Sequence, residues 1–323
     1  MVAGTLRGSG TDSALHVANA LFVARDGGVK PEFAVALQTR MNAQARTVRS
    51  AADVNAWCAS QTRGAISHIL DDAAISPETV MLLVNAVLFR GRWKFAFRRS
   101  ETVPGVWNAL GDYKPRVSYM NRHFEDEREH LYAGIVGAGA GAGALTRARV
   151  VRVPYTAPNM EAWFILPTER GAAAFAAVGD ALPRLWHEID ALNSQTRKLR
   201  PVYFTCPRFN LDTGTVNMVP ALQRLGVAAA FEPQGGFLNA TDSRLACITG
   251  VVQRVTCTVD EEGTVAAACT AICCEDGAAS DDEDTFSMVL DRPFWMAVVV
   301  RQNLTLPSTP LFIGRIAQPN AAE

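Results

Sequence analysis

A nearly continuous apolar run at 80–89, VMLLVNAVLF, constrains the fold more than any other part of the sequence. A strand with one face in water alternates apolar and polar residues, whereas a strand buried on both faces reads as unbroken apolar sequence. The run therefore predicts a central strand in a sheet that is covered on both sides, and we expect Gly91 to end it. With 323 residues, 49% of them hydrophobic, the chain has enough apolar material for such a core.

The rest of the chain mixes helical and strand patterns. We expect helix where apolar residues recur at helical spacing or follow a capping residue, and strand where short apolar runs lie between turns. The expected helices are 31–41, 54–70 with Asp53 as its cap, 171–185 and 216–225. The expected strands are 150–154, 162–166, 202–209, 294–300 and 311–316. This mixture predicts an α+β fold with a large sheet component.

Charge and composition exclude several functional classes. Lys and Arg number 31 and Asp and Glu number 32, so the net charge is −1. We therefore expect no nucleic-acid partner and no binding to an anionic membrane surface. No apolar run approaches the roughly 18 residues of a membrane-spanning helix, and the first residues lack the apolar core of a secretion signal.

The cysteines give information on the cellular compartment. Seven cysteines in a long chain predict free thiols rather than a disulfide framework, which favours a reducing compartment. Two glycosylation sequons, at Asn239 and Asn303, favour an exported chain instead. We expect a cytoplasmic location, with an extracellular location as the alternative.

No pattern in the sequence assembles a catalytic site. The histidines form no HExxH pattern, and neither CxxC nor Gly-x-Ser-x-Gly occurs. Cys269, Cys273 and Cys274 form a cluster without a second ligand pair. His123 and His130 flank an acidic stretch that is typical of a solvated surface. The Gly- and Ala-rich stretch 137–144 lacks the Lys-Ser/Thr of a phosphate loop, and we expect a flexible loop there. These observations predict neither an enzyme nor a metal or cofactor site.

One segment, VTCTVDEEGTVAAACTAICCEDGAASDDEDTFS at 255–287, is compatible with two different structures. Its alanines favour a helix. As a strand, it would place Thr264, Ala266, Ala268, Thr270 and Ile272 on one face. That face is small enough to enter between two existing strands without overpacking. The segment is therefore either a strand that changes position or an ordinary helix followed by a polar loop.

Within this segment, DEEGTVAAACTA at 260–271 resembles the hinge of the reactive-centre loop of the serpins. Further motifs resemble the same family in the same order, so that the resemblance covers about residues 14–319. These motifs are ANALF at 18–22, KPEF at 30–33, NAW at 55–57, QTRG at 61–64, NAVLFRGRW at 85–93, VPY at 153–155, PRF at 207–209, LG at 225–226, DRPF at 291–294 and LFIGR at 311–315.

The resemblance implies a polar extension over residues 1–13 and a single serpin-like domain over 14–323. The implied fold is α+β, with a large central mixed sheet, smaller sheets, surrounding helices and an exposed reactive-centre loop at about 261–290. The implied activity is inhibition, in which a target protease cleaves the loop and the hinge inserts into the large sheet as a new strand. Gly263 would give the hinge bending freedom. The implied hinge positions are Glu261, Glu262, Gly263, Thr264, Val265, Ala266, Ala267 and Ala268.

Loop length leaves two positions for the reactive bond. The usual serpin loop places the cleavage after Gly277, whereas the shorter loop of poxviral cytokine-response-modifier serpins places it after Asp276. An aspartate offers a carboxylate that an arginine-lined pocket binds, so the Asp276–Gly277 bond predicts a caspase or a granzyme B-like protease as partner. A viral inhibitor of host apoptosis or inflammation would have such a target, and we expect it to act as a monomer in the host cytoplasm.

The sequence also departs from the family pattern. Only a dozen polar residues precede the region that matches, where serpins have several helices and a strand, and Val265 stands where glutamate is usual. The alternative function is therefore that of a non-inhibitory, N-terminally truncated binding protein with a serpin-like fold.

Overall fold

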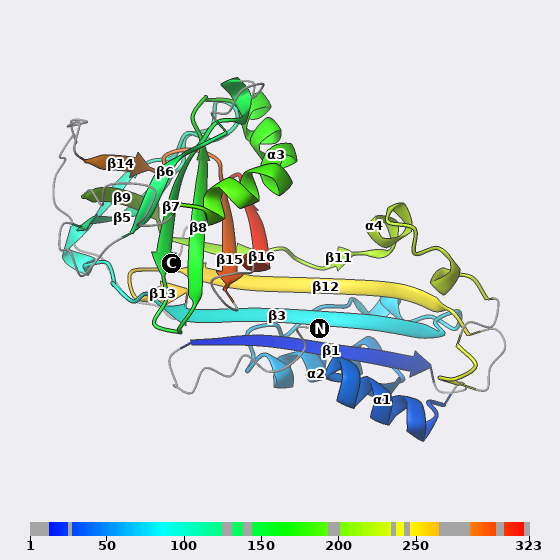
Figure 1. Cartoon of the computed structure of the whole chain (residues 1–323). Helices are drawn as coiled ribbons and strands as arrows, with labels where there is room; N and C mark the ends of the chain where they lie inside the picture. The colour runs from blue at the N-terminus through cyan, green and yellow to red at the C-terminus, as the bar shows by residue number, and fades with distance from the viewer. Residues whose placement is uncertain are drawn as a thin grey trace. The chain divides into compact units, whose positions relative to one another are not determined.

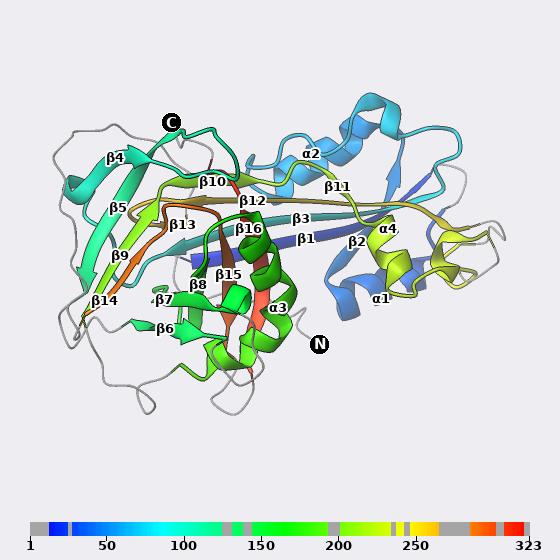
Figure 2. The ribbon, with the colours of Figure 1, turned by 90° about the horizontal axis from the view of Figure 1, so that it is seen from above.

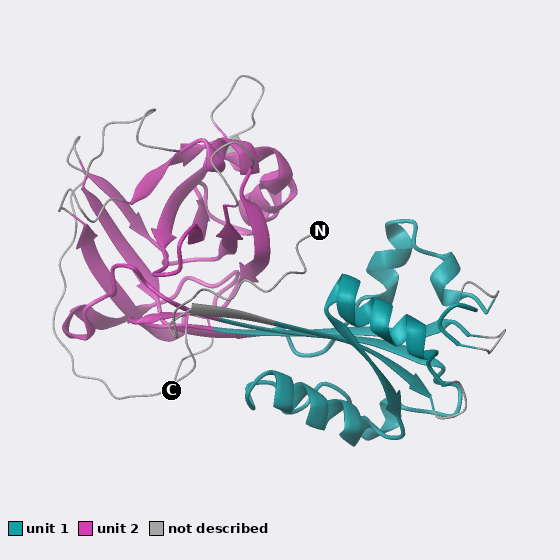
Figure 3. Ribbon diagram, turned by 60° about the horizontal axis from the view of Figure 1, so that its bottom comes forward, with its two compact units in different colours: residues 1–7, 14–89, 212–257 teal, residues 8–13, 90–211, 258–323 magenta. Residues whose placement is uncertain are grey.

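The structure is a computed structural model that describes residues 13–24, 28–124, 131–137, 144–192, 201–233, 237–241, 246–264, 285–301 and 307–319. The chain forms two compact units, which Figure 3 shows in different colours. The first unit includes residues 14–89 and 212–257, and the second includes 90–211 and 258–323. Strands β3 (Met81–Arg92) and β12 (Ile248–Val259) each have residues in both units.

The largest sheet contains seven strands among the described residues, in the order β10-β12-β13-β3-β1-β2, with β11 paired to β12. Figure 1 shows β1, β3 and β12 as long neighbouring strands. β3 and β12 run parallel, from the pair Met81–Ile248 to the pair Leu88–Thr256. The apolar run at 80–89 thus forms a central strand, as its sequence predicts. The other bounds are β1 Ser13–Ala24, β2 Ala43–Val48, β10 Phe209–Asp212, β11 Val216–Asn217 and β13 Gly263–Thr264.

Helices cover this sheet within the first unit. Trp57 of α2 (Ala51–Gln61) packs with Phe22 of β1, and their rings meet edge to face with centroids 5.5 Å apart. Leu37 of α1 (Pro31–Met41) is partly buried against a second cluster that includes Leu21 and Met81. Residues 21 and 22 are neighbours in β1 and are both buried, so this part of the strand is covered on both faces. The short helices of this unit are α4 Val219–Arg224, η2 Asp72–Ala74 and η5 Ala229–Phe231.

The second unit contains two further sheets. One has the strand order β14-β9-β5-β4 and the other β16-β15-β8-β7-β6. Helix α3 (Ala172–Asp190) covers a face of the latter, where Val178 and Leu185 pack with Trp163 and Ile165 (Figure 2). The bounds are β4 Thr102–Val106, β5 Arg116–Phe124, β6 Tyr132–Val136, β7 Ala148–Pro154, β8 Met160–Pro167, β9 Val202–Pro207, β14 Phe286–Val289, β15 Phe294–Val300, β16 Thr309–Ile316, η3 Arg99–Glu101 and η4 Ala144–Thr146.

The helix predicted over 54–70 is wrong at both ends. α2 begins after Ser50, and Asp53 is its third residue rather than its cap, where its Oδ2 accepts the N–H groups of Arg49 and Ser50 at 2.9 and 3.1 Å. The helix ends at Gln61 because Arg63 and Gly64 adopt left-handed φ angles of 53° and 83°.

Other boundaries also differ from the sequence-based expectation, and the helix predicted over 171–185 continues to Asp190 as α3. β3 continues through Gly91, because this residue pairs with Thr264 of β13. The strand predicted over 202–209 is divided into β9 and β10 at Arg208. The helix predicted over 216–225 begins only at Val219, because residues 216–217 form β11 and pair with β12. The predicted α+β class with a large mixed sheet is nevertheless confirmed, whereas a single domain over 14–323 stays a prediction. None of the helices in the described part of the chain is long and apolar enough to cross a membrane.

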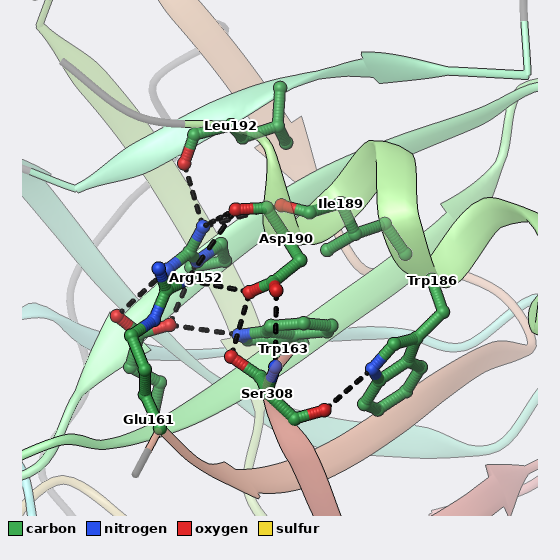
Figure 4. A network of polar contacts seen from close by, with 9 residues as sticks. Arg152, Glu161, Trp163, Trp186, Ile189, Asp190, Leu192 and Ser308 are labelled. Carbon is green, nitrogen blue, oxygen red and sulfur yellow. Dashed lines mark hydrogen bonds and ion pairs between the residues drawn. The ribbon is translucent and has the colours of Figure 1, made fainter. Parts of the chain in front are cut away.

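A buried arginine, which is paired with a glutamate of the same sheet, fixes the end of helix α3 to the five-stranded sheet (Figure 4). Arg152 of β7 is only 2% exposed, and its Nε and Nη2 donate to the two carboxylate oxygens of Glu161 at 2.8 and 3.0 Å. Its Nη1 donates to carbonyl oxygens at the end of α3, at 3.2 Å to Ile189 and 2.6 Å to Leu192. The carbonyls at and just beyond the end of a helix lack the full set of partners found inside it, and this guanidinium supplies them with a charged donor.

The network continues through the last residue of α3. The Asp190 carboxylate accepts a hydrogen bond from Arg301 Nη2 at 2.5 Å. It also accepts hydrogen bonds from the backbone N–H and the hydroxyl of Ser308, at 3.0 and 2.7 Å. Trp186 Nε1 in turn donates to the Ser308 carbonyl oxygen at 2.8 Å. The C-terminal end of α3 is therefore tied to segments that are distant from it in the sequence.

We predict that Arg152→Ala lowers the free energy of unfolding by about 3 kcal/mol, since it leaves the Glu161 carboxylate without its ion-pair partner and removes the donor to the Leu192 carbonyl oxygen. Arg98→Ala is the control, because Arg98 and Glu101 form a solvent-exposed pair worth less than about 1 kcal/mol. Urea unfolding of both variants measures the difference. Equal losses would contradict the assigned role of Arg152.

Candidate functional site: the hinge at residues 260–264

The predicted hinge begins within the described residues as the two-residue strand β13. Thr264 pairs antiparallel with Val259 of β12 on one side and with Gly91 of β3 on the other, and Gly263 pairs with Arg92. β13 therefore lies between two strands that elsewhere pair directly with each other. Figure 1 labels β13 close to β3 and β12. The remaining predicted positions, 265–268 of the hinge and the reactive bond at Asp276–Gly277, lie outside the described residues.

A tight turn at Asp260 reverses the chain between β12 and β13. The Asp260 N–H donates to the Gly263 carbonyl oxygen at 2.8 Å. Its Oδ1 accepts the N–H groups of Glu262 and Gly263 at 2.9 and 3.0 Å. An aspartate suits this position because its short carboxylate can hydrogen-bond to backbone groups two and three residues further on. The turn places residues 263–264 in the sheet, beside β3.

The structure gives a reason for glycine at position 263 besides the bending freedom that the family resemblance implies, which stays a prediction. Gly263 is not among the glycines with a positive φ. A Cβ atom at this position would lie 2.0 Å from the Gly91 carbonyl oxygen and 2.7 Å from the Arg92 Cα. Because both atoms belong to the backbone of β3, they cannot rotate away as a side chain would. A glycine is needed here because two backbones approach too closely for any side chain.

Aromatic residues hold the hinge backbone in place. Trp93 donates its N–H to the Glu262 carbonyl oxygen and its Nε1–H to the Asp260 carbonyl oxygen, both at 2.9 Å. The ring of Trp93 stacks on Tyr155 with centroids 4.6 Å apart. The Tyr155 hydroxyl shares a 2.9 Å hydrogen bond with that of Thr264, which is fully buried. Thr264 thus occupies a closed site that has room only for a small side chain.

The two glutamates of the hinge have different environments. Glu261 is only 4% exposed, accepts the Thr102 hydroxyl at 2.7 Å and forms an ion pair with Arg208 Nε at 3.6 Å. Glu262 is half exposed and pairs with Arg99 at 2.7 Å. Because a buried carboxylate is costly unless it is paired, Glu261 is the one that fixes the hinge to its surroundings.

Burial raises the pKa of Asp260 above its ordinary value. The backbone N–H groups of Glu262 and Gly263 oppose this shift by stabilising the carboxylate, while the charges of Glu261 and Glu262 add to it. Protonation of Asp260 is therefore favoured in the folded state. Its contribution to stability is complete below the ordinary aspartate pKa and is lost as the pH rises through the raised value.

A chain of three side-chain amides links the strands ahead of the hinge in the first unit. Asn85 of β3 donates from Nδ2 to Asn19 Oδ1 of β1, and Gln253 of β12 donates from Nε2 to Asn85 Oδ1, both at 2.7 Å. Asn85 and Gln253 face each other directly in the parallel pairing of β3 and β12. Separating these two strands would therefore break the bond between Asn85 and Gln253.

These supporting residues were missed as site residues from the sequence alone. One signal was available, since Asn85 interrupts an otherwise apolar strand. Nothing local to Thr102 or Arg208 marks them as partners of Glu261, because the three lie far apart in the sequence and meet only in the fold. No group of His, Cys, Asp or Glu able to hold a metal occurs in the described ranges, which include His123 but not His130, Cys269, Cys273 or Cys274.

Comparison with known proteins agrees with this architecture. A family model described as Serpin (serine protease inhibitor) matches residues 1–319. The chain is 28% identical to Serpin B8 of Homo sapiens, with 96% of this chain and 79% of that protein aligned. It is 27% identical to plasminogen activator inhibitor 1 of Neovison vison, with 97% and 74% aligned. The chain belongs to the serpin family.

Solved structures show the same fold. Human kallistatin superposes with a TM-score of 0.77 at 20% identity, covering 97% of this chain and 77% of that one. Serpin48 of the insect Tenebrio molitor superposes with a TM-score of 0.74 at 21% identity, covering 97% and 78%. Members of this family are protease inhibitors rather than catalytic enzymes.

We predict that Gly263→Ala displaces β13 from β3, because the added methyl group meets backbone atoms. The N–H groups of Trp93 and Phe97 donate to the hinge carbonyls of Glu262 and Glu261. Their hydrogen exchange should accelerate more than about tenfold, the equivalent of ~1.4 kcal/mol. Gly28→Ala is the control, since a methyl group there meets nothing within 4 Å. Unchanged exchange at Trp93 and Phe97 would show that the close approach does not matter.

We predict that Asp260→Asn raises the thermal unfolding temperature at pH 7, because the amide oxygen can still accept both N–H groups while the buried charge is removed. The difference from the wild type should shrink toward pH 3, where Asp260 is protonated. Unfolding curves across this pH range measure it, with the exposed Asp180→Asn as control. A variant that is less stable at pH 7 would contradict the raised pKa.

Proposed function

We propose that this serpin inhibits its target protease by inserting the segment after Thr264 between β3 and β12. The observation that carries the proposal is β13 itself, since its two residues, which directly precede this segment, already lie between these strands. Further insertion would replace one parallel strand pair by two antiparallel pairs. Antiparallel pairing is slightly more stable per residue, and each inserted residue can bond to both neighbours. This difference favours insertion once the loop is cut.

The register of β13 supports a cleavage site near Asp276. Gly263 faces Arg92 and Thr264 faces Gly91. If the same antiparallel register continued, Cys274 would face Met81, the first residue of β3. Asp276 would then lie two residues beyond the end of the inserted strand. A segment of this length fits cleavage of the Asp276–Gly277 bond, and Gly277–Ala278 remains the alternative.

In the proposed reaction, the serine or cysteine nucleophile of the protease attacks the Asp276 carbonyl carbon. The Asp276–Gly277 bond breaks, the amine of Gly277 leaves with a proton, and an ester or thioester joins Asp276 to the protease. Insertion of residues 265–274 then carries the acylated protease away from the hinge before water hydrolyses the bond. The energy comes from completing the sheet.

The proposed target is a protease that cleaves after aspartate, such as a caspase or granzyme B, because its pocket can bind the Asp276 carboxylate through paired hydrogen bonds. Such an inhibitor would block apoptosis or inflammation in a host cell, as a poxviral serpin would. A reducing compartment is part of the proposal, in keeping with the free thiols of Cys58, Cys206 and Cys257, whose pKa values burial raises.

We predict that incubation with caspase-1, caspase-8 or granzyme B gives a complex that survives denaturation, with mass spectrometry placing the cut after Asp276. Thr264→Arg should give cleavage without complex, because the buried site of Thr264 cannot hold a charged, longer side chain. Glu262→Arg is the matched control, since Glu262 is half exposed and should still allow trapping. Cleavage of the wild type without any complex would instead favour a non-inhibitory binding protein.

The register also predicts a role for Thr270 in insertion. Extended along both neighbours, it places Thr270 directly between Asn85 and Gln253. The Thr270 hydroxyl could donate to one amide and accept from the other, which would compensate for the bond that separation breaks. Thr270→Val should therefore reduce the trapped fraction several-fold in favour of cleaved chain, while Thr270→Ser should not. If the wild type, Thr270→Val and Thr270→Ser formed the same fraction of trapped complex on a denaturing gel, this register would be contradicted.

A further inference from the structure

Two adjacent pockets in the second unit share a pair of arginines. The larger pocket, about 500 Å³, has an apolar lining that includes Leu110, Phe175 and Pro293. The smaller, about 300 Å³, is more polar and is lined by residues that include Arg149 and Thr168. Arg170 and Arg292 line both pockets. The apolar pocket therefore has a cationic end.

One carboxylate holds both shared arginines in position. Arg170 Nη2 donates to Asp291 Oδ2 at 3.0 Å, and Arg292 Nη1 donates to Asp291 Oδ1 at 2.8 Å. Asn108 Nδ2 also donates to Asp291 Oδ2, at 3.1 Å, and Arg292 Nη2 donates to the Pro167 carbonyl oxygen at 2.8 Å. The Arg292 guanidinium is thus fixed before any ligand arrives, which lowers the entropic cost of binding one, while the more exposed Arg170 is held by one ion pair.

The pockets retain an excess of positive charge and of donors. The guanidinium of Arg149 packs over the Phe286 ring at 4.8 Å and donates to the Ser287 carbonyl oxygen. The three arginines face two carboxylates, those of Asp291 and of Glu169, which is exposed at the rim. The Nε atoms of Arg149 and Arg292 are buried, whereas the side chain of Arg170 is 64% exposed, so Arg170 is the arginine that a ligand reaches most directly. An anion would be attracted to this end of the pocket.

We propose that the two pockets together bind an amphipathic carboxylate. Its headgroup meets Arg170 and Arg292, and its aliphatic body fills the larger pocket between Leu110, Phe175 and Pro293. The volume lies within the range of small-molecule sites, which are apolar cavities with a few converging polar groups. This site goes beyond protease inhibition and uses none of the hinge residues.

Isothermal titration calorimetry with decanoate, kept below its micelle concentration, tests the proposal on the whole chain. Decanol supplies the body without the charge, and inorganic phosphate supplies an anion without the body. We expect one decanoate per chain, bound at least about tenfold more tightly than either control compound. Decanol lacks the charged headgroup that the arginines would bind, and phosphate lacks the aliphatic chain that would fill the apolar pocket. Absence of saturable decanoate binding, or equal binding of decanol, would overturn the proposal.

Variants locate the bound decanoate. Arg170→Met should weaken binding about tenfold through the loss of a charged donor, and Leu110→Asp should abolish it by placing a carboxylate in the apolar pocket. Both side chains are exposed enough to be replaced without unfolding the chain, and thermal melts verify this. Arg184→Met is the matched control on α3, because Arg184 lines neither pocket. Weakening by Arg184→Met to the same extent would show that binding is not at this site.

Discussion

The close approach of Gly263 to the backbone of β3 is the constraint on which the hinge depends. No Cβ fits there, because the Gly91 carbonyl oxygen would lie 2.0 Å away. This approach allows Thr264 to enter the sheet between β12 and β3 and to reach the hydroxyl of Tyr155. The turn at Asp260, the indole of Trp93 and the ion pair of Glu261 then hold the backbone where the approach begins. Without the close packing of Gly263 against β3, these contacts would no longer hold Thr264 between the two strands.

The proposed insertion requires the sheet beyond the hinge to open between β3 and β12. β3 and β12 are joined by parallel pairing and by the amide bond between Asn85 and Gln253. A strand entering antiparallel to both would restore backbone bonding on each side, and its small side chains would add little volume to a packed sheet. Stability and function therefore oppose each other here. In the proposed mechanism, insertion must break the bonds that keep β3 and β12 together, and the proposal requires that cleavage of the loop makes this exchange favourable.

Local patterns predict much of the fold, whereas long-range contacts define the site. The unbroken apolar run of β3 and the helical spacing of α1 follow from burial and periodicity within a few residues. The end of α2 does not, because it depends on left-handed φ angles at Arg63 and Gly64 that the surrounding structure selects. An acidic run such as 260–262 is usually solvated, yet Asp260 and Glu261 are buried. Their partners, Trp93 and Arg208, come from distant parts of the sequence, so neither the small-residue pattern of this segment nor its family resemblance predicts these contacts.

Thermal unfolding before and after cleavage of the loop tests the central claim most directly. If the segment after Thr264 inserts between β3 and β12, the cleaved chain gains strand pairing along its largest sheet. Its unfolding temperature should then rise clearly above that of the intact chain. An unfolding temperature that is unchanged or lower after cleavage would mean that the segment stays outside the sheet, and strand insertion would have to be abandoned as the mechanism.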